Sequence, residues 1–455
     1  MNIIIVGCGQ VGRTLATRLG GDGNNVTVVD KNGFNVRELV DKIDVMGVVG
    51  NGASHTTLLE AGIAEADLLI AVTDSDELNL LCCILAKKNS NCRTIARVRD
   101  REYSRESEYL KDELELAMII NPELATAEEI ARVLRFPTAI SIEPFAKRRV
   151  ELIKFRLPKD NRIVGMTVRD VASKLKTEVL FCTVERDEET IIAKGDLVFC
   201  ERDVISIIAS HNKATDFFKK IGYKTQAVKN AIILGGSKVA RYLCNKFKSH
   251  ELSFKLIESD PGVCDMLSTE FPHVTVVRGD SSDRELLEEE GIESAEALLS
   301  LTDDDENNVL SSLYAGSVGA KKVVTKINRI DFDGVIRHLD LDTVVYPKNI
   351  VADNIVRYVR ATANTHGNNM ETMYNLIPGV VEACEFAIRE ECEIVGIPLS
   401  QLKLKSDVLI ASILRGKSVI IPGGQDSIEV GDSVVVVAKA TSLHDITDLL
   451  ESGDK

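Results

Sequence analysis

The sequence predicts an α/β fold in which two tandem Rossmann-type domains are each followed by a small α+β domain. Three observations predict it. Apolar runs with strand character alternate with amphipathic stretches, which is typical of a parallel sheet covered by helices. A glycine-rich turn, GCGQVG at 7–12, joins the first of these strands to the first helix. The pattern also repeats, because GNGASHTTLLEAGI at 50–63 resembles GDSSDRELLEEEGI at 279–292.

The first domain is expected to contain six strands and a long final helix that begins at Pro122 and ends before Pro137. The strands are predicted at 2–6, 25–30, 45–49, 67–72, 94–98 and 117–120. The duplication extends this organisation to the whole chain, with a polar linker at 223–229 that lacks a core pattern. The four predicted domains are 1–136, 137–222, 230–361 and 370–455.

Composition narrows the possible functions. The chain has 455 residues and a formal net charge of −15, so it lacks the basic field that a nucleic-acid partner usually requires. Its ten cysteines include no C-x-x-C spacing, which disfavours a zinc site and fits a reducing cytosol. No apolar run approaches the length of a membrane helix, roughly 18 residues. We therefore expect a cytoplasmic protein whose contact with a membrane, if it has one, is peripheral.

The glycine-rich turn predicts a dinucleotide site. The first glycine allows a tight turn, the second lets backbone amides approach a pyrophosphate, and the third lets helix and strand pack closely. The phosphates would then lie at the positive end of the helix dipole. Asp30 ends the next strand and can accept hydrogen bonds from a ribose, which favours NAD(H) over NADP(H). The alternative is a turn without a ligand. The candidate residues here are Gly7, Cys8, Gly9, Gln10, Val11, Gly12 and Asp30.

Other loops at the carboxyl edge of the sheet could complete this pocket. The GNGA segment after the third strand could pass over the adenine. Thr73 and Asp74 follow the fourth strand and could contact the ligand. Alternatively, Thr73, Asp74 and Ser75 could cap the next helix, and both roles are compatible. Arg97 on the fifth strand would seek an anion, either a phosphate or a carboxylate such as Asp74. The additional candidates are Asn51, Gly52, Ala53, Thr73, Asp74 and Arg97.

The second glycine turn, GGSKVA at 235–240, departs from the first. It keeps Gly235 and the acidic residue Glu258, but Ser237 stands where the second glycine should be. A side chain there obstructs the path of a pyrophosphate. Its ligand therefore remains open: a different nucleotide such as ATP or ADP, or none.

The sequence gives little support for catalysis. A dehydrogenase needs a general acid or base against the nicotinamide, yet no histidine recurs in both halves at the repeat spacing. No triad-like or metal-like spacing is present either. We expect a protein that is not an enzyme, and the alternative is an NAD-dependent oxidoreductase with a duplicated Rossmann fold.

Taken together, these motifs resemble the RCK (KTN) family, and within it the NAD-binding regulatory subunits of bacterial Trk potassium uptake systems. The most specific segments are MNIIIVGCGQVG, GNGAS, AVTDSDELN, ARV and INPE. The resemblance implies alternating RCK-N and RCK-C domains and a homotetramer that forms a ring through its RCK-N domains. It also implies a potassium-translocating membrane partner of the TrkH or TrkG type on the inner face of the cell membrane. The helices at 122–136 and near 347–361 would cross between neighbouring lobes.

Overall fold

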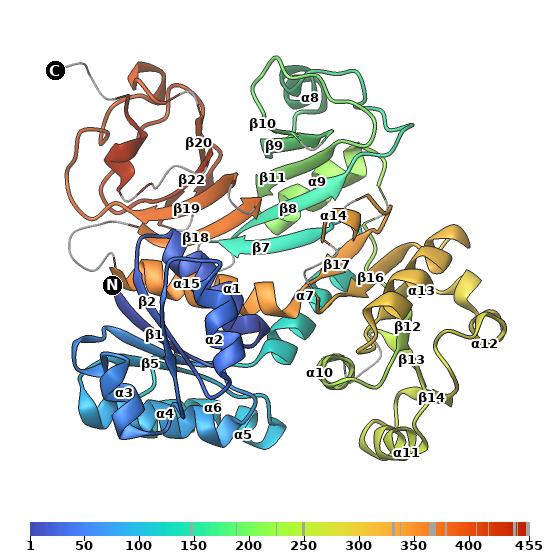
Figure 1. Cartoon of the computed structure of the whole chain (residues 1–455). Coiled ribbons are helices and arrows are strands. Elements are labelled where there is room, and N and C mark those ends of the chain that lie inside the picture. Colours follow the sequence, from blue (N-terminus) through green and yellow to red (C-terminus); the bar gives the residue numbers. More distant parts are fainter. Residues whose placement is uncertain are drawn as a thin grey trace.

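A computed structural model describes most of the chain (Figure 1). The described residues are 1–145, 149–187, 189–223, 225–247, 251–329, 333–336, 338–363, 370–377, 380–405, 407–416, 418–439, 443 and 445–451. These residues form four sheets, two parallel and two antiparallel, which alternate along the chain. The last four residues of the predicted fourth domain, 452–455, lie outside the described part.

The first parallel sheet has the strand order β3-β2-β1-β4-β5-β6. Its order reverses between β1 and β4, which is where a Rossmann-type sheet binds its ligand. The strands are β1 (Asn2–Val6), β2 (Asn25–Asp30), β3 (Met46–Val49), β4 (Leu68–Ala71), β5 (Arg93–Arg97) and β6 (Met118–Ile120). The helices are α1 (Gln10–Gly21), α2 (Gly33–Val40), α3 (His55–Glu60), α4 (Asp76–Asn89), α5 (Arg101–Arg105), α6 (Ser107–Glu113) and α7 (Pro122–Arg135). All six predicted strands are confirmed to within one residue at each end.

The second parallel sheet repeats this order as β14-β13-β12-β15-β16-β17. Its strands are β12 (Asn230–Leu234), β13 (Ser253–Glu258), β14 (Thr275–Arg278), β15 (Ala297–Ser300), β16 (Lys322–Lys326) and β17 (Thr343–Val345). Its helices are α10 (Lys238–Lys246), α11 (Pro261–Glu270), α12 (Arg284–Glu289), α13 (Asp305–Ser317), α14 (Asp333–Ile336) and α15 (Pro347–Ala363). The predicted tandem α/β duplication is therefore confirmed.

Each parallel sheet is followed by an antiparallel one. The first contains β7 (Ser141–Phe145), β8 (Val150–Arg156), β9 (Leu180–Arg186), β10 (Glu189–Ile192) and β11 (Val204–Ala209), with α8 (Val168–Leu175) and α9 (His211–Lys220). The second contains β18 (Met370–Ile377), β19 (Val381–Ala387), β20 (Val408–Arg415), β21 (Ser418–Ile420) and β22 (Ser433–Lys439). Side chains from both sheets share one apolar core, including Phe145, Leu152, Ala383 and Val437.

The helices that end the parallel domains are exchanged between the halves. In the middle of Figure 1, α7 and α15 lie side by side. The apolar face of α7, with Ile130 and Leu134, packs with Leu243 of α10 in the core of the second parallel domain. In the same way, Ile355 of α15 packs with Leu15 of α1 in the core of the first. Neither parallel domain therefore has a complete core without the other half, as the resemblance implied for crossover helices.

The linker prediction is wrong in one respect. The linker was expected to contribute nothing to a core, but its residue Val228 is buried in the core of the second parallel domain. Its amide donates to the carbonyl of Leu134 at 3.0 Å, so the linker is tied to the end of α7. A single valine in a polar segment carries no periodicity, and sequence alone gives no signal for it.

Within the described residues, no helix combines the length and apolar character needed to cross a bilayer. The same part of the chain brings together no group of three or more side chains suited to hold a metal ion.

Removing the buried end of Ile355 tests the exchange of helices. Ile355 is fully buried, although it comes from the second half. We expect Ile355→Ala to lower the free energy of unfolding by roughly 2–5 kcal/mol, because it leaves a cavity in the first domain. Urea denaturation measures this, with Leu310→Ala as the control, since Leu310 is 68% exposed on α13. Equal, small effects of both substitutions would contradict the shared core.

A cluster of carboxylates at the junction of α7, β7 and α15 predicts a pH dependence. Burial raises the pKa of Glu129 from its ordinary value of 4.5 to about 8, with Glu143 and Asp353 adding to the shift and Arg132 opposing it. The folded state therefore holds this proton more tightly than the unfolded state. Its contribution to stability is complete below about pH 4.5 and is lost as the pH rises through about 8.

We expect Glu129→Gln to flatten the fall in unfolding free energy between pH 5 and 8, as measured by denaturant titration at several pH values. Glu128→Gln, the neighbouring substitution on α7, is the control and should keep the wild-type slope. The same slope in both variants would contradict the assignment.

Candidate functional site

The first glycine turn is built by close backbone packing. Gly7 has a left-handed φ of +106°, and a Cβ atom there would lie 3.0 Å from the backbone of Val72 and Thr73. A Cβ on Gly12 would lie 1.8 Å from the carbonyl oxygen of Gly7. These two glycines therefore bring the start of α1 against the ends of β1 and β4. Gly9 is different, since a Cβ there would meet nothing within 4 Å.

The N-terminus of α1 keeps its hydrogen-bond donors available. Gly9 is the N-cap residue and supplies no side-chain cap, and no acidic residue occupies the first turn. The amides of the first turn, which include those of Gln10 and Val11, have no intrahelical acceptor. Together with the helix dipole they form a site for an anion.

Asp30 holds the turn in place. One carboxylate oxygen accepts from the amide of Cys8 at 2.7 Å, and the other accepts from the amide of Asn32 at 2.8 Å. The Cys8 amide is therefore already engaged. The Cys8 thiol is buried, and burial, followed by the charge of Asp30, raises its pKa to about 12, while Arg13 opposes the shift. Cys8 thus contributes its backbone and its packing rather than a reactive thiolate.

Arg13 also has protein partners. It donates to the carbonyl of Cys8 at 3.0 Å and forms an ion pair with Glu38 at 2.6 Å. Its guanidinium further bonds to Asn35 at 3.3 Å. In this conformation Arg13 links the glycine turn to Asn35 and Glu38 of α2.

The GNGA loop lies beside the same strand. Gly52 is a packing glycine, because a Cβ there would lie 2.1 Å from Val6 and 3.2 Å from the sulfur of Cys82. Asn51 is exposed, and its side-chain oxygen accepts from the amide of Ala53 at 3.0 Å. The loop is therefore fixed by its own turn and leaves Asn51 at the surface.

At the end of β4, the helix cap is Ser75, whose hydroxyl accepts from the amide of Leu78 at 3.1 Å. Thr73 has another role. Its amide and hydroxyl both donate to the side-chain oxygen of Asn79, each at 2.7 Å. The nitrogen of the fully buried Asn79 donates to the carbonyls of Thr73 and Arg97. Asn79 thereby ties the ends of β4 and β5 together.

Arg97 is the buried cation of the site. Only 9% of its side chain is exposed, and it donates to the carbonyl of Thr73 and, at 3.2 Å, to Asp74. Burial and the charge of Arg99 lower its pKa, while Asp74 raises it. Asp74 is fully exposed, so its hold on Arg97 is weakened by solvent. Within the described residues the Nε atom of Arg97 has no hydrogen-bond partner.

The second glycine turn keeps the same scaffold. Gly235 has a φ of +90°, and Glu258 accepts from the amide of Gly236 at 2.7 Å, as Asp30 does from Cys8. The difference is Ser237, which caps its own helix by accepting from the amide of Ala240 at 3.5 Å. Its side chain thus occupies one first-turn donor, the Ala240 amide, where α1 has no side-chain cap.

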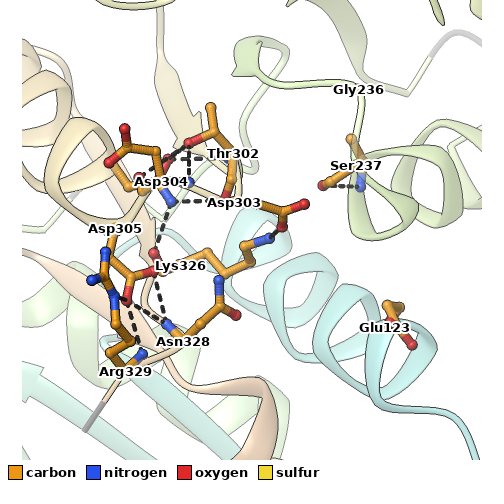
Figure 2. A network of polar contacts seen from close by, with 12 residues as sticks. Glu123, Gly236, Ser237, Thr302, Asp303, Asp304, Asp305, Lys326, Asn328 and Arg329 are labelled. Atoms are coloured by element: carbon orange, nitrogen blue, oxygen red, sulfur yellow. Dashed lines mark hydrogen bonds and ion pairs between the residues drawn. The ribbon is translucent and has the colours of Figure 1, made fainter. Parts of the chain in front are cut away.

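Figure 2 shows the polar network at the end of β15 and β16 in the second copy. Lys326 is buried and pairs with the exposed Asp303 at 2.8 Å, which repeats the pair of Arg97 and Asp74. Asp305 accepts from the amides of Asn328 and Arg329. The two copies therefore place a buried cation at matching positions.

The sequence interpretation missed two side chains at the first site. Asn79 recurs as Asn308 at the repeat spacing, so a signal for it was present. Lys348, at the start of α15, donates to the side-chain oxygen of Gln10 at 3.1 Å. It lies more than 300 residues away in sequence, and no local pattern connects it to the turn.

Comparison with known proteins is consistent across the whole chain. The TrkA-N domain matches residues 3–122 and 231–347, and the TrkA-C domain matches 152–222 and 384–451. These matches cover most of the sequence. The chain belongs to the TrkA family.

Two relatives of this TrkA-family chain match it almost end to end. It is 30% identical to Trk system potassium uptake protein TrkA homolog 1 of Methanosarcina mazei, covering 98% of this chain and 99% of that one. It is 32% identical to Trk system potassium uptake protein TrkA of Haemophilus influenzae, covering 96% and 95%. The chain is thus a TrkA-family protein with tandem TrkA-N and TrkA-C (RCK) domains.

Solved structures show the same fold. The GsuK channel bound to NAD has a TM-score of 0.62 at 16% identity, covering 96% of this chain and 77% of that one. The GsuK RCK domain has a TM-score of 0.62 at 17% identity, covering 96% and 92%.

The roles of the two glycines predict different effects of substitution on the free energy of unfolding. Gly12→Ala should lower the free energy of unfolding by about 1–3 kcal/mol, because its Cβ meets the Gly7 carbonyl. Gly9→Ser, which copies the second turn, should be neutral or slightly stabilising, because it adds a cap in open space. Chemical denaturation of both variants measures this, and a strongly destabilised Gly9→Ser would contradict the open position.

Proposed function

We propose that this chain binds NAD(H) at its first glycine turn and thereby regulates a potassium-translocating membrane subunit of the TrkH or TrkG type. The observation that carries the proposal is the uncapped N-terminus of α1, with open space beside Gly9. A pyrophosphate there accepts from the first-turn amides and lies at the positive end of the helix.

Two further residues support a dinucleotide. The guanidinium of Arg97 places a positive charge at the carboxyl edge of the sheet, and its ion-pair partner Asp74 is exposed to solvent. Asp30 uses each carboxylate oxygen once on the backbone, which leaves lone pairs for a ribose. Its negative charge favours NAD(H) over a ligand with a 2′-phosphate. The remaining candidates, Asn51 to Ala53 and Thr73 to Asp74, border the same edge of the sheet.

The second turn is proposed as a weaker or different nucleotide site. Ser237 accepts from the Ala240 amide, so a phosphate at this turn would have one first-turn amide fewer than at the first turn. ATP or ADP are the candidates from the sequence, and a GsuK structure is described as bound to ADP.

The assembly is part of the proposal. Four chains would associate through their parallel domains into a ring on the cytoplasmic face of the membrane. Two relatives are named Trk system potassium uptake proteins, and these names support a membrane partner of the Trk type. A ligand regulates such a ring only by binding two of its shapes with different affinity. The exchange of α7 and α15 gives the site a mechanical connection to both halves.

Titration calorimetry with NADH tests this function. The wild-type chain should bind NADH saturably, and Gly9→Ser should bind it at least about tenfold more weakly, because its hydroxyl caps the amides. The alternative, an oxidoreductase, predicts a substrate-dependent change in NADH absorbance. A wild-type chain that does not bind NADH, or one that turns over a hydroxy acid or an amino acid, would overturn the proposal.

A further inference from the structure

Asn79, in the first turn of α4, is a fully buried polar side chain at the edge of the first site. Its oxygen accepts from the amide and from the hydroxyl of Thr73, each at 2.7 Å. Its nitrogen donates to the carbonyl of Thr73 at 3.1 Å and to the carbonyl of Arg97 at 2.9 Å. Every lone pair and every N–H group of this amide side chain therefore has a partner, which holds the side chain in one orientation.

These bonds begin where the backbone ladder between β4 and β5 ends. The last residues paired across the two strands are Ala71 and Ala96. Thr73 and Arg97 lie beyond that pair, so the ladder does not fix the spacing between them. Buried backbone amides and carbonyls need partners, and here the side chain of Asn79 supplies them in place of a neighbouring strand.

Both parts of the proposed dinucleotide site are placed against Thr73. A Cβ atom on Gly7 would lie 3.0 Å from the amide nitrogen of Thr73, which is the amide that Asn79 holds. The guanidinium of Arg97 donates to the carbonyl of Thr73, which also accepts from Asn79. Asn79 thus fixes the one backbone segment that the glycine turn and the buried cation share.

The second copy contains the same bonds around Asn308. Its oxygen accepts from the amide and hydroxyl of Thr302 at 3.0 and 2.7 Å, and its nitrogen donates to the carbonyls of Thr302 and Lys326 at 2.9 and 3.0 Å. The cation differs, because the ammonium group of Lys326 bonds to Asp303, as Figure 2 shows, and in the described part of the chain makes no bond to the Thr302 carbonyl. Asn308 is therefore a matched control that lies in the other parallel domain.

We propose that Asn79 is a positioning residue of the first site, which sets the spacing between the glycine turn and the Arg97 guanidinium for a dinucleotide pyrophosphate. The proposal rests on the function proposed above. A ligand that is held both by helix amides and by a guanidinium binds more tightly when these groups are already in place before it arrives. Asn79 is fully buried, so it acts through Thr73 and Arg97.

The first test compares Asn79→Ala with Asn308→Ala in the full chain. Each substitution removes the same set of hydrogen bonds, so both should lower the urea midpoint of the ligand-free protein by similar amounts. Only Asn79→Ala should weaken NADH binding in titration calorimetry, by about tenfold or more. Wild-type NADH affinity in Asn79→Ala, or an equal loss of affinity in both variants, would overturn the proposal.

The second test is a double-mutant cycle on NADH affinity with Asn79→Ala and Arg97→Gln. Because Asn79 acts in part through Arg97, the double variant should bind NADH more tightly than the product of the two single losses predicts. Losses that simply multiply would show a general structural effect and contradict the positioning role.

Asn79→Asp and Asn308→Asp replace the alanine variants if Asn79→Ala does not fold. They keep the shape and the acceptor oxygen but lose the N–H groups that bond to the carbonyls, and the same outcomes apply. Each contradicting result above leaves NADH binding in the wild type intact and removes this inference alone. A wild-type chain that does not bind NADH removes the proposed function as well.

Discussion

The site depends on one close approach: the start of α1 lies directly against the carbonyl of Gly7. Only glycine at position 12 permits it, because any side chain would overlap that oxygen. The contact directs the first turn of α1 toward the carboxyl edge of the sheet, where the strand order reverses between β1 and β4. Asp30 then fixes the turn through the Cys8 amide. The donors that remain are available because the surrounding backbone is already satisfied.

The exchanged helices α7 and α15 connect the first glycine turn structurally to both halves of the chain. The core of the first parallel domain is closed by α15, and the core of the second by α7. A shift of either helix therefore changes the packing of a domain to which it does not belong in sequence. The two antiparallel sheets lie next to each other above these helices in Figure 1, and their side chains form a further shared core. Under the function proposed above, ligand binding would be coupled to the relative position of the halves, because close-packed cores do not deform gradually.

Sequence reasoning predicted what local chemistry determines. Alternating apolar runs gave the strands, and the spacing of glycines gave the turn, because both follow from backbone geometry over a few residues. The shared core of α7 and α10 was expected only from resemblance, and the contact of Lys348 with Gln10 was not predicted. Both contacts join elements that are far apart in the sequence, so no local pattern predicts them. The burial of Val228 was not predicted for the same reason, because a single apolar residue in a polar linker forms no periodic hydrophobic pattern.

The two glycine turns use the N-terminal amides of their helices differently. An N-terminal amide can bond to a capping side chain or to a ligand, but one donor cannot fully serve both. Ser237 stabilises α10 without a ligand, whereas Gly9 leaves α1 with unsatisfied donors until an anion arrives. One cap bond therefore distinguishes the two turns in the absence of a ligand. Under the function proposed above, the first turn keeps its amides for a ligand, the second gives one of them to its own serine, and the crossover helices connect the two.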